Sequence, residues 1–310
     1  MVAGVRSKLI VVDYPTFTLQ EFDLGFNARW ACFSPAGEIL CVGDGGKAVL
    51  MDGTKTISLE SGVTSNLRCA SYSPSGELLI VGNNGLILFG TAFERLNAER
   101  SENFRRVVWS PNGDRALIVG NNGAALMFEQ NTNSFITIDG AVNNLRCASW
   151  PPGQEPVVVG NAFADMFVPT PNVYRLRGER LEPVGQEAGV DLLAVDYCHS
   201  KGVFLTVGYD VVFHEPRAYI LSDGMERLDW KAEAVYPSAL GLHPNEEVGI
   251  VATSHPSVSK NRRCFTYIYR RQEFETLYES VGYGFVCASW SVNGDKALLL
   301  ASRSARTFNV

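Results

Sequence analysis

Four histidines are the residues of this 310-residue chain best suited to acid–base chemistry or metal binding. Two of them, His214 and His255, stand in consecutive loops, and Asp165, Asp210 and Glu215 fall near them in the expected topology. A histidine pair with carboxylates could hold a metal ion or transfer protons. The alternative is that both are exposed loop histidines, because no compact metal-ligand spacing occurs. We therefore predict no metal and no other cofactor.

Motifs for nucleophilic catalysis are absent from the sequence. There is no G-x-S-x-G, and no cysteine has a plausible base beside it. The stretches "GNNG" and "GDGG" have the composition of hairpin turns rather than phosphate loops, because no helical pattern follows them. His199 and His243 fall in short turns, where we expect solvated side chains. A non-enzymatic role is thus favoured, with a hydrolase or lyase site around His214 and His255 as the alternative.

Arginine recurs in an "N-x-R" element that occurs four times. Arginines that converge on an opening form a fork-shaped receptor for carboxylate or phosphate. They could equally tie the fold together by bonding carbonyls or an acid of a neighbouring unit. The asparagines two residues earlier, Asn27, Asn66, Asn103 and Asn144, are typical turn formers. The arginines of the element are Arg29, Arg68, Arg105 and Arg146.

Composition narrows the class of protein. Apolar residues make up 46% of the chain and charged residues 19%, which excludes a disordered chain. The formal charge of −6 argues against a protein devoted to nucleic acid. The seven cysteines contain no C-x-x-C pair, so we expect reduced, buried thiols and a cytoplasmic location. No apolar stretch is long enough to span a membrane.

The "N-x-R" element belongs to a longer repeat. "NLRCASYSPSGELLIVGNNG" returns in altered form as "NARWACFSPAGEILCVGDGG" and "NFRRVVWSPNGDRALIVGNNG". A marker glycine closes the apolar run at Gly43, Gly82, Gly120, Gly160 and Gly208, with Ala252 and Ala301 in the equivalent places. The spacings are 39, 38, 40, 48, 44 and 49 residues. A period near 40 with short β-rich runs is typical of propeller blades.

Each unit is interpreted as four antiparallel strands, a to d, with "SPxG" as the a–b turn and "GNNG" as the b–c turn. We predict an all-β, seven-bladed β-propeller that occupies residues 1–310 as a single domain. The ends of the chain would share the last blade, which residues 1–25 complete. The sequence leaves open whether "KLIVVDY" or "RTFNV" is its third strand. The predicted starts of strand a lie near Asn27, Asn66, Asn103, Asn144, Asp191, Pro237 and Phe285.

The "SPxG…VGxxG" pattern, preceded by the aromatics Phe33, Tyr72 and Trp109, resembles the superfamily of seven-bladed propellers with WD-type and related repeats. "VGNNGLILFG" and "VGNNGAALMF" look especially like blades of photosystem II assembly-factor propellers. The Gly-His and Trp-Asp pairs of true WD repeats are missing. The resemblance implies an interaction platform, since members of this superfamily have that role more often than they are hydrolases or lyases. The fold alone does not decide between these functions.

The working face is predicted from where the repeat is lengthened. Three consecutive units carry long b–c connectors, "NAFADMFVPTPN", "YDVVFHEPR" and "TSHPSVSKNRR", and the "N-x-R" elements open on the same face. Insertions on one face of a repeat protein favour binding there, although drift in loops that tolerate lengthening is the alternative. In blades five to seven Leu193, Ser238 and Val286 take the arginine position. The candidate partner-binding residues of the connectors are Phe163, Asp165, Phe167, Tyr209, His214, Arg217, His255, Arg262 and Arg263.

A basic stretch with interleaved aromatics, "KNRRCFTYIYRRQEF" from Lys260 to Phe274, raises the alternative of single-stranded nucleic acid. The competing interpretation places its aromatics against neighbouring blades and Arg270 and Arg271 at a hairpin. The leading hypothesis is therefore a soluble interaction scaffold that binds a protein or peptide on the face carrying the d–a and b–c loops, with an acidic partner as one option. The partner's identity and the oligomeric state do not follow from the sequence.

Overall fold

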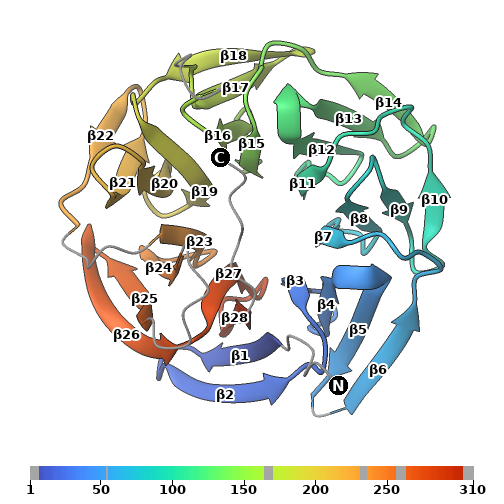
Figure 1. Ribbon diagram of the computed structural model, residues 1–310, viewed down its shortest axis with the longest axis horizontal. Coiled ribbons are helices and arrows are strands. Elements are labelled where there is room, and N and C mark those ends of the chain that lie inside the picture. Colours follow the sequence, from blue (N-terminus) through green and yellow to red (C-terminus); the bar gives the residue numbers. More distant parts are fainter. Residues whose placement is uncertain (1–6, 54, 164–169, 231–235, 256–262, 303–310) are drawn as a thin grey trace.

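Seven four-stranded antiparallel sheets stand around a central axis in the computed structural model, which describes residues 7–53, 55–163, 170–230, 236–255 and 263–302 (Figure 1). The molecule is a seven-bladed β-propeller, which confirms the predicted fold. Each blade runs from an inner strand a, beside the axis, to an outer strand d, so a regular sequence repeat becomes a ring.

The inner strands surround the central channel, and each begins within one residue of the position expected from the repeat. Their side chains alternate between the two neighbouring blades, which buries most of them. The inner strands are β3 (Ala28–Phe33), β7 (Leu67–Tyr72), β11 (Phe104–Trp109), β15 (Leu145–Ser149), β19 (Val190–Cys198), β23 (Tyr236–Leu242) and β27 (Gly284–Trp290).

The second strands are the continuous apolar runs of the repeat, and they are covered on both faces by neighbouring blades. In β8 every residue is buried. These strands are β4 (Ile39–Gly43), β8 (Leu78–Gly82), β12 (Arg115–Gly120), β16 (Val157–Gly160), β20 (Val203–Asp210), β24 (Val248–Ser254) and β28 (Lys296–Ser302).

The third and fourth strands complete the blades toward the outside. Two short 3-10 turns, η1 (Asp44–Gly46) and η2 (Asn121–Gly123), join strands b and c in blades one and three. The third strands are β5 (Lys47–Asp52), β9 (Ile87–Phe89), β13 (Ala125–Glu129), β17 (Val173–Arg177), β21 (Glu215–Leu221), β25 (Arg263–Arg270) and β1 (Ser7–Asp13). The fourth strands are β6 (Lys55–Glu60), β10 (Glu94–Leu96), β14 (Ser134–Thr137), β18 (Arg180–Gly185), β22 (Met225–Arg227), β26 (Glu273–Val281) and β2 (Thr18–Asp23).

The closing blade joins strands from opposite ends of the chain. Its order is β2-β1-β28-β27, and β1 pairs with β28 from Ser7 opposite Ser302 to Asp13 opposite Lys296. The open question from the sequence is thereby answered, because the segment "KLIVVDY" supplies the third strand. Pairing the two ends removes the open sheet edges that an unclosed array would expose.

The "SPxG" turns on the a–b side are held by their serines. In blades one to three the hydroxyl of Ser34, Ser73 or Ser110 accepts, at 2.9 to 3.1 Å, the N–H of a residue at the start of the return strand or directly before it. The turn glycine has positive φ in each blade, for example 88° at Gly37. The repeated motif is thus explained by turn geometry alone.

His243, in the a–b turn of blade six, differs from the prediction of a solvated side chain. It is 4% exposed, and its ring lies 4.9 Å from the rings of both Tyr14 and Trp290. Its Nδ1 accepts the backbone N–H groups of Asn245 and Glu246. The prediction was wrong because the turn packs against the closing blade, whose Tyr14 is remote in sequence.

Strand a carries an irregularity at the same place in every blade. In blades one to four a β-bulge separates the first pair of the a–b ladder from the next, and the bulged residue is the arginine of "N-x-R". In blades five to seven two or three pairs precede the bulge. Opposite the residue before the bulge lies the marker glycine. In blade six this place is taken by Thr253, opposite Pro237, rather than by the expected Ala252, which pairs one step further along with Ala239. The bulged residues of blades five to seven are Leu193, Ser238 and Val286.

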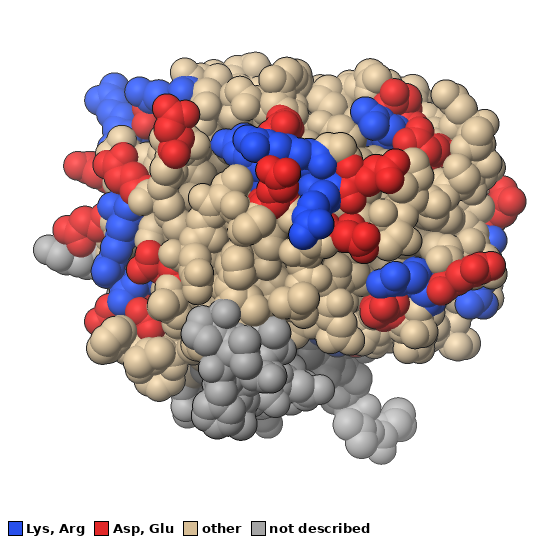
Figure 2. All heavy atoms as spheres, turned by 90° about the horizontal axis from the view of Figure 1, so that it is seen from above, with Lys and Arg blue, Asp and Glu red and all other residues tan. Residues whose placement is uncertain are grey.

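The outer surface, viewed at the edge of the disc, mixes charges of both signs. Figure 2 shows lysines and arginines interspersed with acids over this surface rather than gathered in one field. An example is Arg177, which pairs with both Glu155 and Glu182. Among the described residues, no helix is long and apolar enough to cross a membrane.

Candidate functional site

The four arginines of the "N-x-R" elements each bond the first residue after the marker glycine of their own blade. Their Nε atoms donate to a side-chain oxygen at 2.6 to 2.8 Å. The bulge turns each arginine toward the b–c loop, so strand a and the loop are tied at the rim of the channel. The four pairs are Arg29 with Asp44, Arg68 with Asn83, Arg105 with Asn121, and Arg146 with Asn161.

The asparagines of the same elements link one blade to the next. The side-chain oxygens of Asn66, Asn103 and Asn144 each accept a backbone N–H from the b–c loop of the preceding blade at 3.0 Å. Asp191 does the same for Ala162 between blades four and five. The asparagines are therefore inter-blade links, a role that the sequence prediction of simple turn formers missed.

Charge compensation differs around the arc of arginines. Arg29 makes two hydrogen bonds to the carboxylate of Asp44, from Nε at 2.7 Å and Nη2 at 2.8 Å. Arg68 and Arg146 bond a neutral amide instead. Burial lowers the pKa of both guanidiniums, and for Arg68 the charge of Arg29 adds to this effect. The charges of Asp44, near Arg68, and of Asp191, near Arg146, oppose it without reversing it. The carboxylate of Asp44 therefore offsets part of the free-energy cost of burying Arg29. The amide partners of Arg68 and Arg146 carry no charge that would do the same.

The ion pair between Asp44 and Arg29 leads to a testable prediction about stability. Burial by itself raises the pKa of Asp44, but the hydrogen bonds and charge of Arg29 outweigh it, and the pKa lies below its ordinary value of 3.8. A carboxyl whose pKa is lower in the folded state stabilises the protein at neutral pH, and this stabilisation disappears as the pH falls. We expect Asp44→Asn, which copies blades two to four, to cost about 1 kcal/mol of unfolding free energy at pH 7.

The measurement is urea unfolding of both proteins between pH 7 and pH 3. The difference should shrink as the pH falls below 3.8. Asp52→Asn, at the exposed end of β5, removes the same charge and serves as the control. A wild-type advantage that grows on acidification would contradict the assigned ion pair.

The b–c hairpin of blade five carries a rigid apolar tip. Val212 is 61% exposed and Phe213 71% exposed. Their backbone N–H groups are both accepted by Oδ1 of Asp210, and Oδ2 of Asp210 is held by Nη2 of Arg217 at 2.8 Å. His214 closes the turn with a φ of 59°. The tip is thus fixed before any partner arrives.

Two of the predicted contact residues support this hairpin from below. Tyr209 is 4% exposed and stacks on Tyr236 with 3.6 Å between ring centroids. Arg217 is 6% exposed and lies between Asp210 and Glu215. Their burial assigns them to the base of the hairpin, while Phe213 forms its exposed end.

The lengthened segments of blades four, five and six all join strands b and c, but the prediction of a long connector is wrong for blade five. There β20 continues to Asp210 and β21 begins at Glu215, so the extra residues lengthen the two strands and only residues 211–214 form the turn. Phe163 is partly buried at the start of the blade-four connector, and His255 is partly buried at the start of the blade-six connector. The predicted residues Asp165, Phe167 and Arg262 lie outside the described residues. Leu193, Ser238 and Val286 leave blades five to seven without a rim arginine, so the arc covers blades one to four.

The hypothesis of a metal or acid–base site finds no support in the described part of the chain, where no cluster of three or more His, Cys, Asp or Glu side chains could hold a metal ion. His214 is exposed on the hairpin. Asp210, expected beside it as a ligand, is bonded to Arg217 and to backbone N–H groups. All seven cysteines are free and buried, in agreement with the prediction of reduced thiols.

The basic and aromatic stretch is a structural strand where it is described, from residue 263 onward. Phe265, Tyr267 and Tyr269 are 8%, 6% and 3% exposed and pack between blades five and six, so they offer no stacking surface for bases. Arg263 is paired with Glu279 on β26. The interpretation with aromatics against a neighbouring blade is the one that the burial supports.

Sequence reasoning missed Arg106, the residue after the rim arginine of blade three. Its guanidinium lies 4.0 Å from the ring centroid of Trp30, which belongs to blade one. Its Nε and Nη1 and the Nε1 of Trp30 are buried without a hydrogen-bond partner among the described residues. Residues two blades apart can meet only across the channel, so this pair lies in its interior, below the rim.

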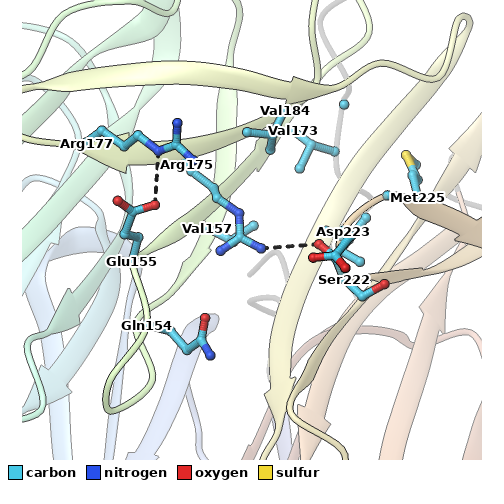
Figure 3. A pocket seen from close by; sticks show the side chains of 13 residues that line it. Gln154, Glu155, Val157, Val173, Arg175, Arg177, Val184, Ser222, Asp223 and Met225 are labelled. Carbon is cyan, nitrogen blue, oxygen red and sulfur yellow. Dashed lines mark hydrogen bonds and ion pairs between the residues drawn. The ribbon is translucent and has the colours of Figure 1, made fainter.

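A cavity of about 360 Å³ lies between blades four and five, toward the outside of the disc (Figure 3). Arg175 extends into it and donates to the carbonyl oxygen of Ser222 at 3.4 Å. Valines from blade four and Met225 from blade five form its apolar walls, and Arg175 and Arg177 are balanced in charge by Glu155 and Asp223. The cavity is a seam between blades with no net charge, and we assign no function to it.

Comparisons with known proteins agree with this architecture. No protein-family model matches the chain, and no curated protein matches it in sequence. The β-propeller domain of Cps50 (Swd1) from Myceliophteria thermophila superposes with a TM-score of 0.64 at 11% identity, covering 89% of this chain and 96% of that one. Hydrazine synthase of Kuenenia stuttgartiensis superposes with a TM-score of 0.68 at 12% identity, covering 86% and 90%. These likenesses show the fold alone. The likeness to photosystem II assembly factors stays a prediction from the sequence.

Proposed function

We propose that the protein is a non-enzymatic scaffold that binds an acidic protein or peptide segment on the rim formed by its d–a and b–c loops. β-Propellers commonly serve as interaction platforms, and the Swd1 propeller domain has the same architecture. The proposal concerns the face and the chemistry of the partner.

One observation carries the proposal: the rim arginines of blades two and four are held in place by neutral amides. The bond from Nε to Asn83 or Asn161 fixes the guanidinium but leaves its charge uncompensated by that partner. A guanidinium fixed in this way can offer its Nη groups to a carboxylate with little loss of side-chain freedom. Where the repeat has Asp44 instead, the charge is neutralised inside the blade.

The surroundings of the rim favour an acidic partner over a neutral one. The chain as a whole carries a charge of −6 and the described arginines of the outer edge, such as Arg177 and Arg263, pair with acids. A local group of cations on an acidic protein steers a negatively charged segment to one place and repels it elsewhere.

The apolar tip of blade five would supply the second contact. Phe213 projects on the side of the b–c loops, and its hairpin is fixed by Asp210. Exposed aromatic side chains held on rigid supports often dominate the binding energy of an interface. A partner segment with acidic residues followed by an apolar group therefore fits the rim.

The experiment uses fluorescein-labelled hexaglutamate as the probe and measures anisotropy against the purified full-length protein. Arg68→Glu with Arg146→Glu should weaken binding about 100-fold, since each lost pair of opposite charges contributes roughly tenfold and the reversal adds repulsion. Wild-type binding should weaken as salt is added.

The matched control reverses two arginine or lysine charges near the a–b turns, at Arg115 and Lys201. Changing both to Glu alters the net charge equally and should leave hexaglutamate binding within about twofold of wild type. Equal losses in the two double variants would mean that only net charge matters, and unchanged binding in the rim variant would refute the proposed face.

A further inference from the structure

The central channel contains a half-buried arginine, Arg106, at one level of the inner strands, and the Nε and Nη1 atoms of its guanidinium are buried. The residues directly after the bulges form this level, and five of the seven are small: Cys or Ala. Only Trp30 and Arg106 have long side chains there, and they lie one upon the other with 4.0 Å between the guanidinium carbon and the ring centroid. The level consists of Trp30, Cys69, Arg106, Cys147, Ala194, Ala239 and Cys287.

Groups from blades around the whole ring act on Arg106. Cys69, Cys147 and Cys287 come from blades two, four and seven and lie at the same level as Arg106, and the carboxylate of Asp196 from blade five is near enough to act on its charge. Because Trp30 belongs to blade one, the guanidinium is surrounded from five blades. This places it close to the propeller axis.

The carboxylate nearest in depth to Arg106 is that of Asp196, and it accepts hydrogen bonds from other residues. Oδ1 of Asp196 accepts the N–H of Tyr197, and Oδ2 accepts the N–H of Leu242 at 2.9 Å. No ion pair joins Asp196 to Arg106 within the described residues. Burial raises the pKa of Asp196 despite these bonds, so its charge is itself poorly accommodated.

Three N–H donors at this point lack an acceptor among the residues that the structure describes: Nε and Nη1 of Arg106 and Nε1 of Trp30. Leaving a buried donor of a charged group unpaired costs more than leaving a neutral one, and an uncompensated buried cation is more costly still. The other repeats avoid this cost with cysteine or alanine. The arginine in blade three is therefore a departure from the repeat that packing does not explain.

We propose that the channel binds a small carboxylate at Arg106 and Trp30, as a site separate from the rim. A carboxylate carries one negative charge and two oxygens that can accept several N–H groups, which matches one guanidinium and one indole donor. A phosphate dianion would leave a second charge uncompensated among thiols and methyl groups. Within the described part of the chain, five of the seven positions at this level carry only Cys or Ala, so no other long side chain of the level competes with such a ligand.

The experiment measures thermal unfolding of the full-length protein in sodium propionate and in sodium chloride or sodium phosphate of equal ionic strength. Propionate should raise the Tm by roughly 2–4 °C relative to chloride, since a ligand that binds only the folded state stabilises it. Arg106→Met should abolish the propionate-specific rise. The variant is expected to fold, because replacing a buried charge with an apolar side chain of similar volume is often neutral or stabilising.

Arg105→Met is the matched control, because it removes the neighbouring arginine at the rim and should keep the rise. Trp30→Phe retains the aromatic face but removes the Nε1 donor, and it should weaken the propionate effect about tenfold in midpoint concentration. A rise with chloride or phosphate as large as with propionate would overturn the carboxylate assignment. No rise in wild type, or a rise lost in Arg105→Met and kept in Arg106→Met, would overturn the site. These outcomes leave the hexaglutamate test of the rim unaffected.

Discussion

Gly120→Val should destabilise the propeller by about 3 kcal/mol and lower its Tm by roughly 5 °C. A Cβ at Gly120 would lie 2.5 Å from the carbonyl oxygen of Asn103 and 3.0 Å from the Cα of Phe104. That carbonyl accepts the N–H of Asn121, so it cannot move aside without breaking the tie between strand a and the b–c loop. Displacing it would also disturb the bond from Arg105 to the side chain of Asn121.

The reason for the glycine is contact rather than backbone angle. Gly120 has an extended φ of −162°, which any residue can adopt. Blades six and seven have Thr253 and Ala301 at this register, whereas in blade five a Cβ at Gly208 would meet the carbonyl oxygen of Asp191 at 2.2 Å. In blades one to four this glycine therefore lies against the carbonyl of the asparagine that opens "N-x-R".

Chemical unfolding compares Gly120→Val with Gly224→Ala. A Cβ at Gly224 would have no atom within 4 Å, and the backbone there has no positive φ, so this replacement should change stability by less than about 0.5 kcal/mol. A loss at Gly120 no larger than at Gly224 would show that the strand and loop can separate at little cost.

Asp210→Ala should cost about 3 kcal/mol of unfolding free energy, because it leaves the buried Arg217 without its main counter-ion. Both side chains are 7% exposed. The same carboxylate also holds the N–H groups of Val212 and Phe213, so the hairpin tip should lose its fixed conformation. Amide hydrogen exchange at the tip should accelerate together with the loss of global stability.

Glu215→Ala is the control within the same cluster. Glu215 contacts Arg217 at 2.5 Å, a shorter distance than the 2.8 Å from Asp210, but its side chain is 57% exposed. Solvent screens an exposed partner, so this change should cost less than about 1 kcal/mol. If Glu215→Ala were the more damaging change, the distance of the contact would matter more than its burial.

The regular features of the fold could be predicted from the sequence because they depend on local chemistry. Proline and glycine define the a–b turns, and continuous apolar runs define strand b, so the blades and the shared closing blade follow from their spacing. The arginine position was also aligned correctly through all blades, because the bulge lies at a fixed distance from the turn.

The irregular features depended on contacts between distant parts of the chain. Arg105 and Arg106 are neighbouring residues of the same type. The bulge directs the side chain of Arg105 toward the b–c loop and that of Arg106 into the channel. His243 is buried by Tyr14, more than two hundred residues away. Thr253 takes the marker place because the ladder of blade six is shifted by one residue, which no turn motif signals.

Hydrogen–deuterium exchange with and without hexaglutamate tests the proposed binding face most directly. We expect slower exchange on binding in the b–c turns of the arginine-bearing blades, at residues 44–46, 83–85 and 121–123. The a–b turns at residues 34–38 and 73–77 should not change. Slower exchange confined to the a–b turns, or none at the rim when the peptide is bound, would contradict the proposal that the arginine rim receives the acidic partner.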